Sequence, residues 1–187
     1  MQLILGSGSP RRQEILEKLG YQFKILTADV EESCDQSMGL EQLSIYNAQL
    51  KAEAVFASLP NQEQVVVLGS DTVVWLENQA YGKPKDRRDA IRMLTNLSGK
   101  THQVGTGVAL VSHSGIRTYC EISEVTFHTL NRNEIESYID EVYVMDKAGA
   151  YAIQDGGQRI VQNYTGEYET IMGLPTIRLQ EELQKIL

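Results

Sequence analysis

The stretch that most constrains the fold is an apolar run, VVVLGSDTVVW, at residues 65–75. β-Branched and aromatic side chains favour extended strands that are buried in a sheet. The run is too short to cross a bilayer. We therefore expect two strands, at residues 65–68 and 72–75, separated by Gly69, Ser70 and Asp71. A carboxylate at the end of a buried strand costs free energy unless it is paired, hydrated or bound to a metal. Asp71 is thus a candidate metal ligand or general base, the alternative being a residue that only caps a turn.

Two helices are expected in the first third of the chain. Pro10 fits the first turn of a helix that Ser9 caps and Gly20 ends. A longer helix is expected at residues 40–58, with its apolar side formed by Leu43, Tyr46, Leu50 and Ala54.

Further helix and strand patterns alternate through the rest of the chain. Asp86 is a predicted cap for a helix that ends near residues 98–99, and Asn131 with Glu134 forms a predicted capping box. Between them, two alternating strands near residues 104–110 and 125–129 flank a turn at residues 112–115. The last twelve or so residues have a helical pattern. Interleaving of this kind predicts a mixed α/β domain with both parallel and antiparallel strand pairs.

Composition excludes several classes of protein. A length of 187 residues fits one domain, and a formal net charge of -8 disfavours general binding to nucleic acid or to an anionic membrane. Cys34 and Cys120 form no CxxC pattern, so free thiols in a reducing compartment are expected. The N-terminus has no charged leader followed by an apolar region, which predicts a cytoplasmic protein. The three histidines have no zinc-ligand spacing.

The first strand-to-helix turn, SGSPRR at residues 7–12, opposes the acidic character of the chain. Backbone N–H groups at a helix start form an anion site together with the helix dipole. Arg11 and Arg12 add guanidinium groups that suit phosphate oxygens. Neither the P-loop pattern nor the Rossmann glycine pattern is present. By itself this motif fits a phosphate site and a solvated turn about equally well.

Other candidate side chains are weak when each is taken alone. Lys83 stands before a proline in GKP and could point at a phosphate, and Glu32 could supply a second carboxylate beside Asp71. Gln154 follows the small residues of DKAGAYAIQ and could read the edge of a base. Lys51 falls on the predicted long helix. Taken singly, lysines and glutamines of this kind are more often solvated surface residues.

Together, six motifs resemble the Maf family of nucleoside triphosphate pyrophosphatases over essentially the whole chain. They occur in the family's order and at suitable spacing: SGSPRR at residues 7–12, GSDTV at 69–73, GKP at 82–84, LSGKTHQV at 97–104, DKAGAYAIQ at 146–154 and MGLP at 172–175. Each motif is weak alone, but six in register are highly specific. The resemblance implies one domain over residues 1–187. Its fold is expected to be α/β, with a strongly twisted mixed central sheet and two lobes around a cleft, similar to the inosine triphosphatase-like enzymes.

The resemblance also implies an activity and a set of site residues. The expected reaction is hydrolysis of a nucleoside triphosphate between its α and β phosphates, with Mg²⁺ or Mn²⁺ required, in a homodimer. The family's proton acceptor falls on Asp71, and the resemblance leaves open whether this residue is base, metal ligand or both. Glu32 is the second implied metal ligand. The implied substrate-binding residues are Ser7, Arg11, Arg12, Lys51, Thr72, Lys83 and Gln154.

Within the family, the chain resembles the branch of dTTP/UTP pyrophosphatases most. The positions that set specificity in that branch fall on Arg12, Thr72 and Gln154, and Lys147 also favours it over the branch that acts on 7-methyl-GTP. Two stretches depart from the branch pattern: Ala152 and Asp155 flank Gln154 where glycines are common, and VYVM at residues 142–145 replaces a usual Glu-Pro pair. These departures put the substrate preference in question more than the reaction. The alternatives are a 7-methyl-GTP pyrophosphatase and a non-catalytic nucleotide-binding regulator of cell division.

Overall fold

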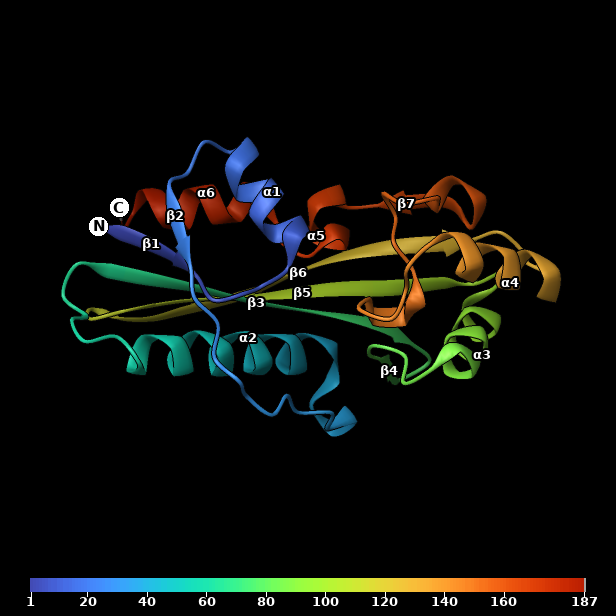
Figure 1. Cartoon of the computed structure of the whole chain (residues 1–187), viewed down its shortest axis with the longest axis horizontal. Coiled ribbons are helices and arrows are strands. Elements are labelled where there is room, and N and C mark those ends of the chain that lie inside the picture. Colours follow the sequence, from blue (N-terminus) through green and yellow to red (C-terminus); the bar gives the residue numbers. More distant parts are fainter. Residues whose placement is uncertain (187) are drawn as a thin grey trace.

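A twisted sheet of seven strands runs along the molecule in the computed structural model, which describes residues 1–186 (Figure 1). The strand order is β2-β1-β3-β5-β6-β7, and β4 pairs with β3. The β1, β2 and β3 strands are parallel, whereas all other pairs are antiparallel, so the predicted mixed sheet is confirmed. The strands are β1 (Gln2–Leu5), β2 (Phe23–Ile25), β3 (Val65–Leu76), β4 (Gln79–Tyr81), β5 (Thr101–Ser112), β6 (Gly115–Phe127) and β7 (Val161–Thr165).

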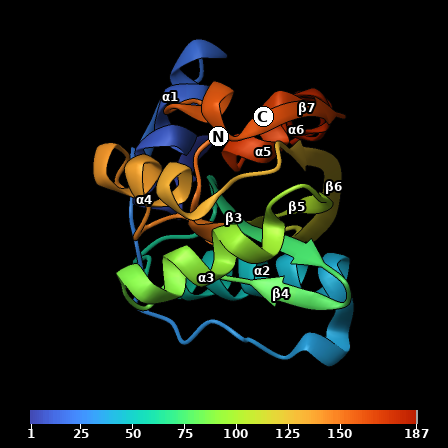
Figure 2. The same ribbon diagram turned by 90° about the vertical axis from the view of Figure 1, so that its right-hand side faces the viewer.

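Helices cover both faces of this sheet. The long helix α2 lies on one face, while α1, α5 and α6 lie on the other (Figure 1). The α3 and α4 helices pack against each other at one end of the sheet, as the view in Figure 2 shows. The helices are α1 (Pro10–Lys18), α2 (Gly39–Ala57), α3 (Arg87–Leu97), α4 (Arg132–Glu141), α5 (Tyr168–Met172) and α6 (Thr176–Gln184), with single 3₁₀ turns η1 (Gln36–Met38), η2 (Ala148–Ala150) and η3 (Gly157–Arg159).

Two of the three predicted helix caps form as expected. The Asp86 carboxylate accepts from the Asp89 N–H at the start of α3, and Asn131 with Glu134 forms a complete capping box on α4. Ser9 occupies the N-cap position of α1 and Pro10 its first turn, as expected, but the Ser9 side chain makes no cap hydrogen bond. The Ser7 hydroxyl accepts from the Ser9 N–H instead.

The central strand differs from the expectation of two strands separated by a break. β3 is continuous from Val65 to Leu76, and Gly69, Ser70 and Asp71 lie within it. The reason is its long partner: β5 pairs with β3 from Val66 through Trp75 without interruption. Asp71 is therefore in the middle of a strand and not at its end.

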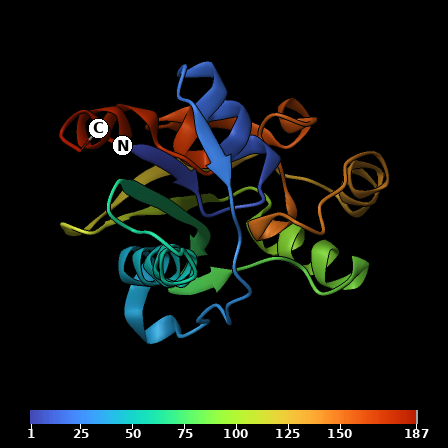
Figure 3. The ribbon, with the colours of Figure 1, turned by 60° about the vertical axis from the view of Figure 1, so that its left-hand side comes forward.

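One edge of β3 is left open in the middle of the sheet. β1 pairs with β3 only as far as Leu68, and β4 pairs with it only from Val74. Between these points, within residues 1–186, β3 has a strand partner on the β5 side alone. The loop after β1 and the long connection from β2 to α2 run past this open edge (Figure 3). Asp71, Thr72 and Val73 line a cavity at this edge.

Glycines in the sheet allow α2 to approach it closely. A Cβ atom on Gly107 would lie 2.2 Å from the Ser44 carbonyl carbon, and one on Gly69 would lie 2.2 Å from the Ala48 carbonyl oxygen. The buried side of α2 consequently contains small and polar residues as well as leucines. Tyr46, which was expected on the apolar side, is exposed. The residues that α2 buries are Leu40, Leu43, Ser44, Asn47, Ala48, Ala52 and Val55.

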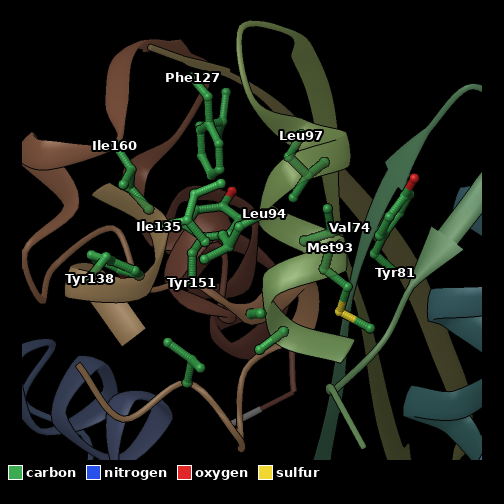
Figure 4. Packing of buried hydrophobic residues seen from close by; sticks show 14 of the residues in the cluster. Val74, Tyr81, Met93, Leu94, Leu97, Phe127, Ile135, Tyr138, Tyr151 and Ile160 are labelled. Atoms are coloured by element: carbon green, nitrogen blue, oxygen red, sulfur yellow. The ribbon is translucent and has the colours of Figure 1, made fainter. Parts of the chain in front are cut away.

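The largest apolar cluster joins the end of the sheet to α3, α4 and the segment after α4 (Figure 4). Phe127 and Tyr151 meet edge to face at its centre, with ring centroids 4.8 Å apart. His102 packs at right angles to Phe127, and its Nε2 lies 2.9 Å from the Tyr151 hydroxyl. This pair fixes the segment that leads to Gln154 against the sheet.

None of the helices within residues 1–186 has the length and apolar character that a membrane span requires.

We expect Gly107→Ala to lower the free energy of unfolding by about 3 kcal/mol or more, because the new methyl group would overlap the α2 backbone. Chemical denaturation measures this change. Gly82→Ala is the matched control, since nothing lies within 4 Å of its Cβ position. Equal stability of the two variants would contradict the close packing of α2 on the sheet.

Acid is expected to destabilise the protein through His102. Burial lowers the pKa of this imidazole to about 4, from 6.5. In the unfolded chain His102 takes up its proton near pH 6.5, whereas in the folded protein it does so only near pH 4. Stability from this group is therefore complete above about pH 6.5 and is lost as the pH falls toward 4, up to about 3 kcal/mol.

His102→Gln keeps a partner for Tyr151 and does not titrate. Urea denaturation between pH 7.5 and 4.5 should show wild type losing stability faster than this variant. Parallel curves for the two proteins would contradict the prediction.

Candidate active site

A cavity of about 560 Å³ opens at the uncovered edge of β3. Its walls come from the β1–α1 loop, the connection from β2 to α2, the middle of β3, and the segments that follow β4 and α4. The sequence motifs that lie far apart in the chain therefore meet in one place. The candidate residues that line this cavity are Ser7, Arg11, Arg12, Glu32, Lys51, Asp71, Thr72, Lys83 and Gln154.

Lys51 joins the two candidate carboxylates. Its ammonium group lies 2.6 Å from Asp71 Oδ1 and 2.8 Å from Glu32 Oε1. Burial alone raises the pKa of Glu32, but the hydrogen bond and charge of Lys51, with further help from Lys83 and Arg12, outweigh it and hold that pKa below its usual range. Lys51 is largely buried, so the lysine is part of the site and not a solvated surface group.

Alternation along β3 divides the site between the two faces of the sheet. Asp71 faces α2, whereas Ser70 and Thr72 face the other side, where α1 and α5 lie. The Ser70 hydroxyl donates to the Gly173 carbonyl, which also accepts from Arg12. A single extended segment thus presents a carboxylate to one half of the cavity and hydroxyl groups to the other.

Arg12 is held in place by three protein acceptors. Its Nε, Nη1 and Nη2 donate to the Gly173 carbonyl, the Ser7 hydroxyl and the Thr72 hydroxyl at 2.7, 2.9 and 3.1 Å. Burial lowers the pKa of Arg12 to about 10, and the charge of Asp71 opposes that shift. A guanidinium has five N–H groups, so the contacts described leave two of them for a ligand.

The Thr72 and Thr106 hydroxyls form a hydrogen-bonded chain next to Arg12, and the partners at its two ends determine which hydroxyl donates. Arg12 can only donate to Thr72, and Thr106 donates to the Thr170 carbonyl at 2.7 Å. The Thr72 and Thr106 hydroxyls lie 2.9 Å apart, so the Thr72 hydroxyl must be the donor in that pair. Thr72 therefore has no proton left for a ligand. The fully buried Thr106 was not singled out from the sequence, because nothing in its strand pattern distinguishes it.

The remaining candidates lie at the mouth of the cavity. Arg11 is in the first turn of α1, and the exposed Lys83 follows Gly82, whose carbonyl accepts from the Gly149 N–H. Gln154 is half-buried, and its amide donates to the Asp155 carboxylate at 3.3 Å. Arg11 and Lys83 bring positive charge from two separate motifs to one cavity, whereas Gln154 is placed where a ligand could contact its amide.

Asn47 is a site residue that the sequence analysis missed. Its amide nitrogen donates to Asp71 Oδ2 at 3.3 Å and to the Ser33 carbonyl at 3.1 Å. A polar residue on the buried side of a predicted helix is a usable signal, because a buried amide requires partners. That signal was hidden because the wrong side of the helix was taken to be buried.

The donors fit a small hard cation that also binds substrate. Within residues 1–186 no group of three or more His, Cys, Asp and Glu side chains is arranged to hold a metal ion. Glu32 and Asp71 nevertheless converge on a single cationic group, the Lys51 ammonium. Mg²⁺ is commonly held by one or two carboxylates together with substrate phosphates. Two converging carboxylates beside a cation-lined cavity match that arrangement.

Comparison with known proteins identifies the family. The sequence model described as "Maf-like protein" matches residues 2–186. The chain belongs to the Maf family. A relative from Akkermansia muciniphila named dTTP/UTP pyrophosphatase is 44% identical over 92% of this chain and 90% of that protein. Relatives with the same name from Bacillus cereus and Aliivibrio fischeri are 42% and 43% identical, and cover 98% and 100% of this chain and 94% and 98% of theirs.

The fold of this Maf chain is also found outside its close relatives. The structure of the Staphylococcus aureus Ham1 protein superposes with a TM-score of 0.52 at 14% identity, covering 84% of this chain and 90% of that one. At that identity the likeness concerns the fold alone. It confirms the expected α/β class with a mixed, twisted central sheet.

We expect Thr106→Val to destabilise the protein by about 1–3 kcal/mol, because it leaves the Thr72 hydroxyl without its acceptor and removes the Thr106 donor from the Thr170 carbonyl, which keeps only the Gly173 N–H. Thr101→Val on the same strand is the control. Thr101 makes a similar hydroxyl pair with Thr126 at 2.8 Å, but this pair is exposed, so the change should stay within about 0.5 kcal/mol. Equal effects in urea denaturation would contradict the buried hydroxyl chain.

Proposed function

We propose that this Maf protein is a nucleoside triphosphate pyrophosphatase that hydrolyses dTTP and UTP to the monophosphate and pyrophosphate. The observation that carries the proposal is the Asp71 carboxylate, bound by Lys51 and Asn47 and exposed to a cavity lined with cationic side chains. Membership of the Maf family and relatives named dTTP/UTP pyrophosphatase at 42–44% identity support the same activity.

Asp71 is proposed to accept a proton from the attacking water. It is the one carboxylate in the middle strand of the sheet that faces the cavity, and its two oxygens are oriented by different partners: Lys51 bonds Oδ1 and Asn47 bonds Oδ2. A carboxylate fixed at both oxygens can hold a water molecule in one orientation. General base catalysis depends on that geometry.

The cationic side chains are proposed to hold the triphosphate. The β1–α1 loop and the start of α1 offer backbone N–H groups and the two remaining N–H groups of Arg12 to phosphate oxygens, with Arg11 beside them. Lys83, which follows β4, lines the same cavity. Positive groups on several sides stabilise charge that spreads over the phosphate oxygens in the transition state. This arrangement explains why an acidic chain has two adjacent arginines at its first helix.

Recognition of the nucleobase is assigned to Arg12, Thr72 and Gln154. Because the Thr72 hydroxyl donates its proton to Thr106, Thr72 would act toward a nucleobase only as a hydrogen-bond acceptor or by its shape. Gln154 supplies an amide with both donor and acceptor groups. Asp155, which now accepts from Gln154, would keep this amide near the cavity mouth.

Glu32 and Asp71 would hold a divalent cation, Mg²⁺ or Mn²⁺, together with the triphosphate. When bound, such a cation would neutralise phosphate charge and polarise the bond that breaks. The Lys51 ammonium would then interact with fewer carboxylate oxygens and could turn toward the phosphates.

The wider setting follows from the same family. We propose one domain over residues 1–187 with two lobes around the cavity, in line with a sheet that continues through separate apolar clusters on either side of Asp71. Cys34 and Cys120 are free thiols, which supports a reducing compartment such as the cytoplasm. The homodimer stays a prediction from the family resemblance.

Asp71→Asn should lower pyrophosphate release from dTTP and UTP by at least about a hundredfold, because the amide cannot accept the proton from water. The measurement is metal-dependent pyrophosphate release from dTTP, UTP, CTP, GTP and 7-methyl-GTP by wild type and variant. Thermal denaturation of both proteins controls for folding.

The substrate panel separates the alternatives. Preference for 7-methyl-GTP would keep the reaction and overturn the assignment of the base-recognition residues. Turnover by Asp71→Asn within a few-fold of wild type would overturn the role of Asp71. Absence of release from every nucleotide in the presence of Mg²⁺ or Mn²⁺ would favour a binding protein.

A further inference from the structure

The wall of the cavity that carries Glu32 has no regular secondary structure. Residues 27–35, here called the wall segment, connect β2 to η1, and most of them line the cavity. The segment passes from the face of the sheet that carries α1 to the face that carries α2 (Figure 3). Some specific contact must therefore determine where Glu32 lies relative to Asp71.

Within residues 1–186, Asp35 at the end of this segment caps the adjoining η1 turn, and the other hydrogen bonds that join the segment to helices or strands come from two side chains of α2. Lys51 binds the Glu32 carboxylate, whereas Asn47 binds the backbone of Ser33. The Glu32 side chain is 42% exposed, and exposed ion pairs contribute little. Asn47 is 3% exposed, so the amide end of its hydrogen bonds is shielded from water. The segment consequently depends on Asn47 more than on Lys51.

The contacts of the Asn47 amide determine its orientation. Its oxygen accepts from the Ser33 N–H at 2.8 Å, and its nitrogen donates to the Ser33 carbonyl at 3.1 Å and to Asp71 Oδ2 at 3.3 Å. The reversed amide would place oxygen against two acceptors and nitrogen against a donor. Asn47 thus pairs with the Ser33 backbone as a neighbouring strand would, and contacts the proposed base at the same time.

We propose that Asn47 is a positioning residue that fixes the wall segment, and with it Glu32, relative to Asp71. The catalytic part of this inference rests on the proposed function, whereas the structural part does not. Asn47 and Lys51 are four residues apart on α2, so both side chains project from one side of the helix. The close approach of α2 to Gly69 and Gly107 brings that side within reach of Asp71.

Asn47→Leu tests the proposal because leucine has a similar volume and makes none of the three hydrogen bonds. Two measurements are made on the whole protein: amide hydrogen exchange at Ser33 without nucleotide or metal, and steady-state pyrophosphate release from dTTP with Mg²⁺. The Ser33 amide donates only to Asn47 among the described contacts, so its exchange reports on this contact directly. Ser44→Ala, a buried polar residue one turn earlier that does not contact Asp71 or Ser33, is the control.

We expect Asn47→Leu to speed Ser33 exchange by about tenfold or more and to lower kcat by a similar factor. The change in KM should be smaller, because the residues assigned to the nucleobase are not altered. Ser44→Ala should change neither quantity by more than about twofold. Asn47→Asp keeps the shape of the side chain and the acceptor for the Ser33 N–H, but it places an oxygen against the Ser33 carbonyl and Asp71 Oδ2. That repulsion should displace the segment and reproduce both effects even if Asn47→Leu folds poorly.

Ser33 exchange within twofold of wild type in both Asn47 variants would overturn the proposal. Faster exchange with unchanged kcat would overturn its catalytic part. If wild type releases no pyrophosphate from any nucleotide, the proposed function fails, and the exchange measurement still decides whether Asn47 fixes the wall segment.

Discussion

The position of α2 on the sheet is the constraint on which the site depends. Gly69 and Gly107 lie on neighbouring strands, directly beneath the helix backbone, and no side chain fits at either position. Because the helix lies so close, the short amide of Asn47 and the ammonium of Lys51 both reach Asp71. With ordinary spacing between helix and sheet, the Asp71 carboxylate would be buried without these partners, and an unpaired buried carboxylate is costly.

A second constraint is the open edge of β3. A central strand with a partner on only one side for several residues leaves backbone and side chains accessible between its neighbours. Ligands in open α/β sheets bind in comparable places, where the strands end and the connections diverge. Here the alternation of β3 directs Asp71 to one face and Thr72 to the other, so one strand contributes side chains to two parts of the cavity.

The contacts around Arg12 illustrate how specificity can be set by residues that never meet a ligand. Thr106 and the Thr170 carbonyl fix the Thr72 proton, Thr72 with Ser7 and the Gly173 carbonyl fixes the guanidinium, and the guanidinium faces the cavity. The same logic applies on the opposite face, where Asn47 binds the Ser33 backbone and Asp71. Each arrangement is built on a buried polar side chain, Thr106 or Asn47, whose hydrogen bonds fix the orientation of its partners.

Much of this protein could be read from its sequence. The mixed α/β class, the α3 and α4 caps, and the hairpin of β5 and β6 follow from local patterns that depend on residues close together in the chain. The nine candidate site residues were also predicted from the sequence, and the structure places all of them around one cavity.

Three features could not be predicted from the sequence: the continuity of β3 through Gly69 and Asp71, the buried side of α2, and the contacts of Asn47 and Thr106. Each depends on a partner that is distant in the chain: β5 for the strand, the sheet glycines for the helix, and Ser33 or Thr170 for the two polar side chains. Local patterns report what a segment can form, whereas tertiary packing decides which of its groups are buried and what they bind.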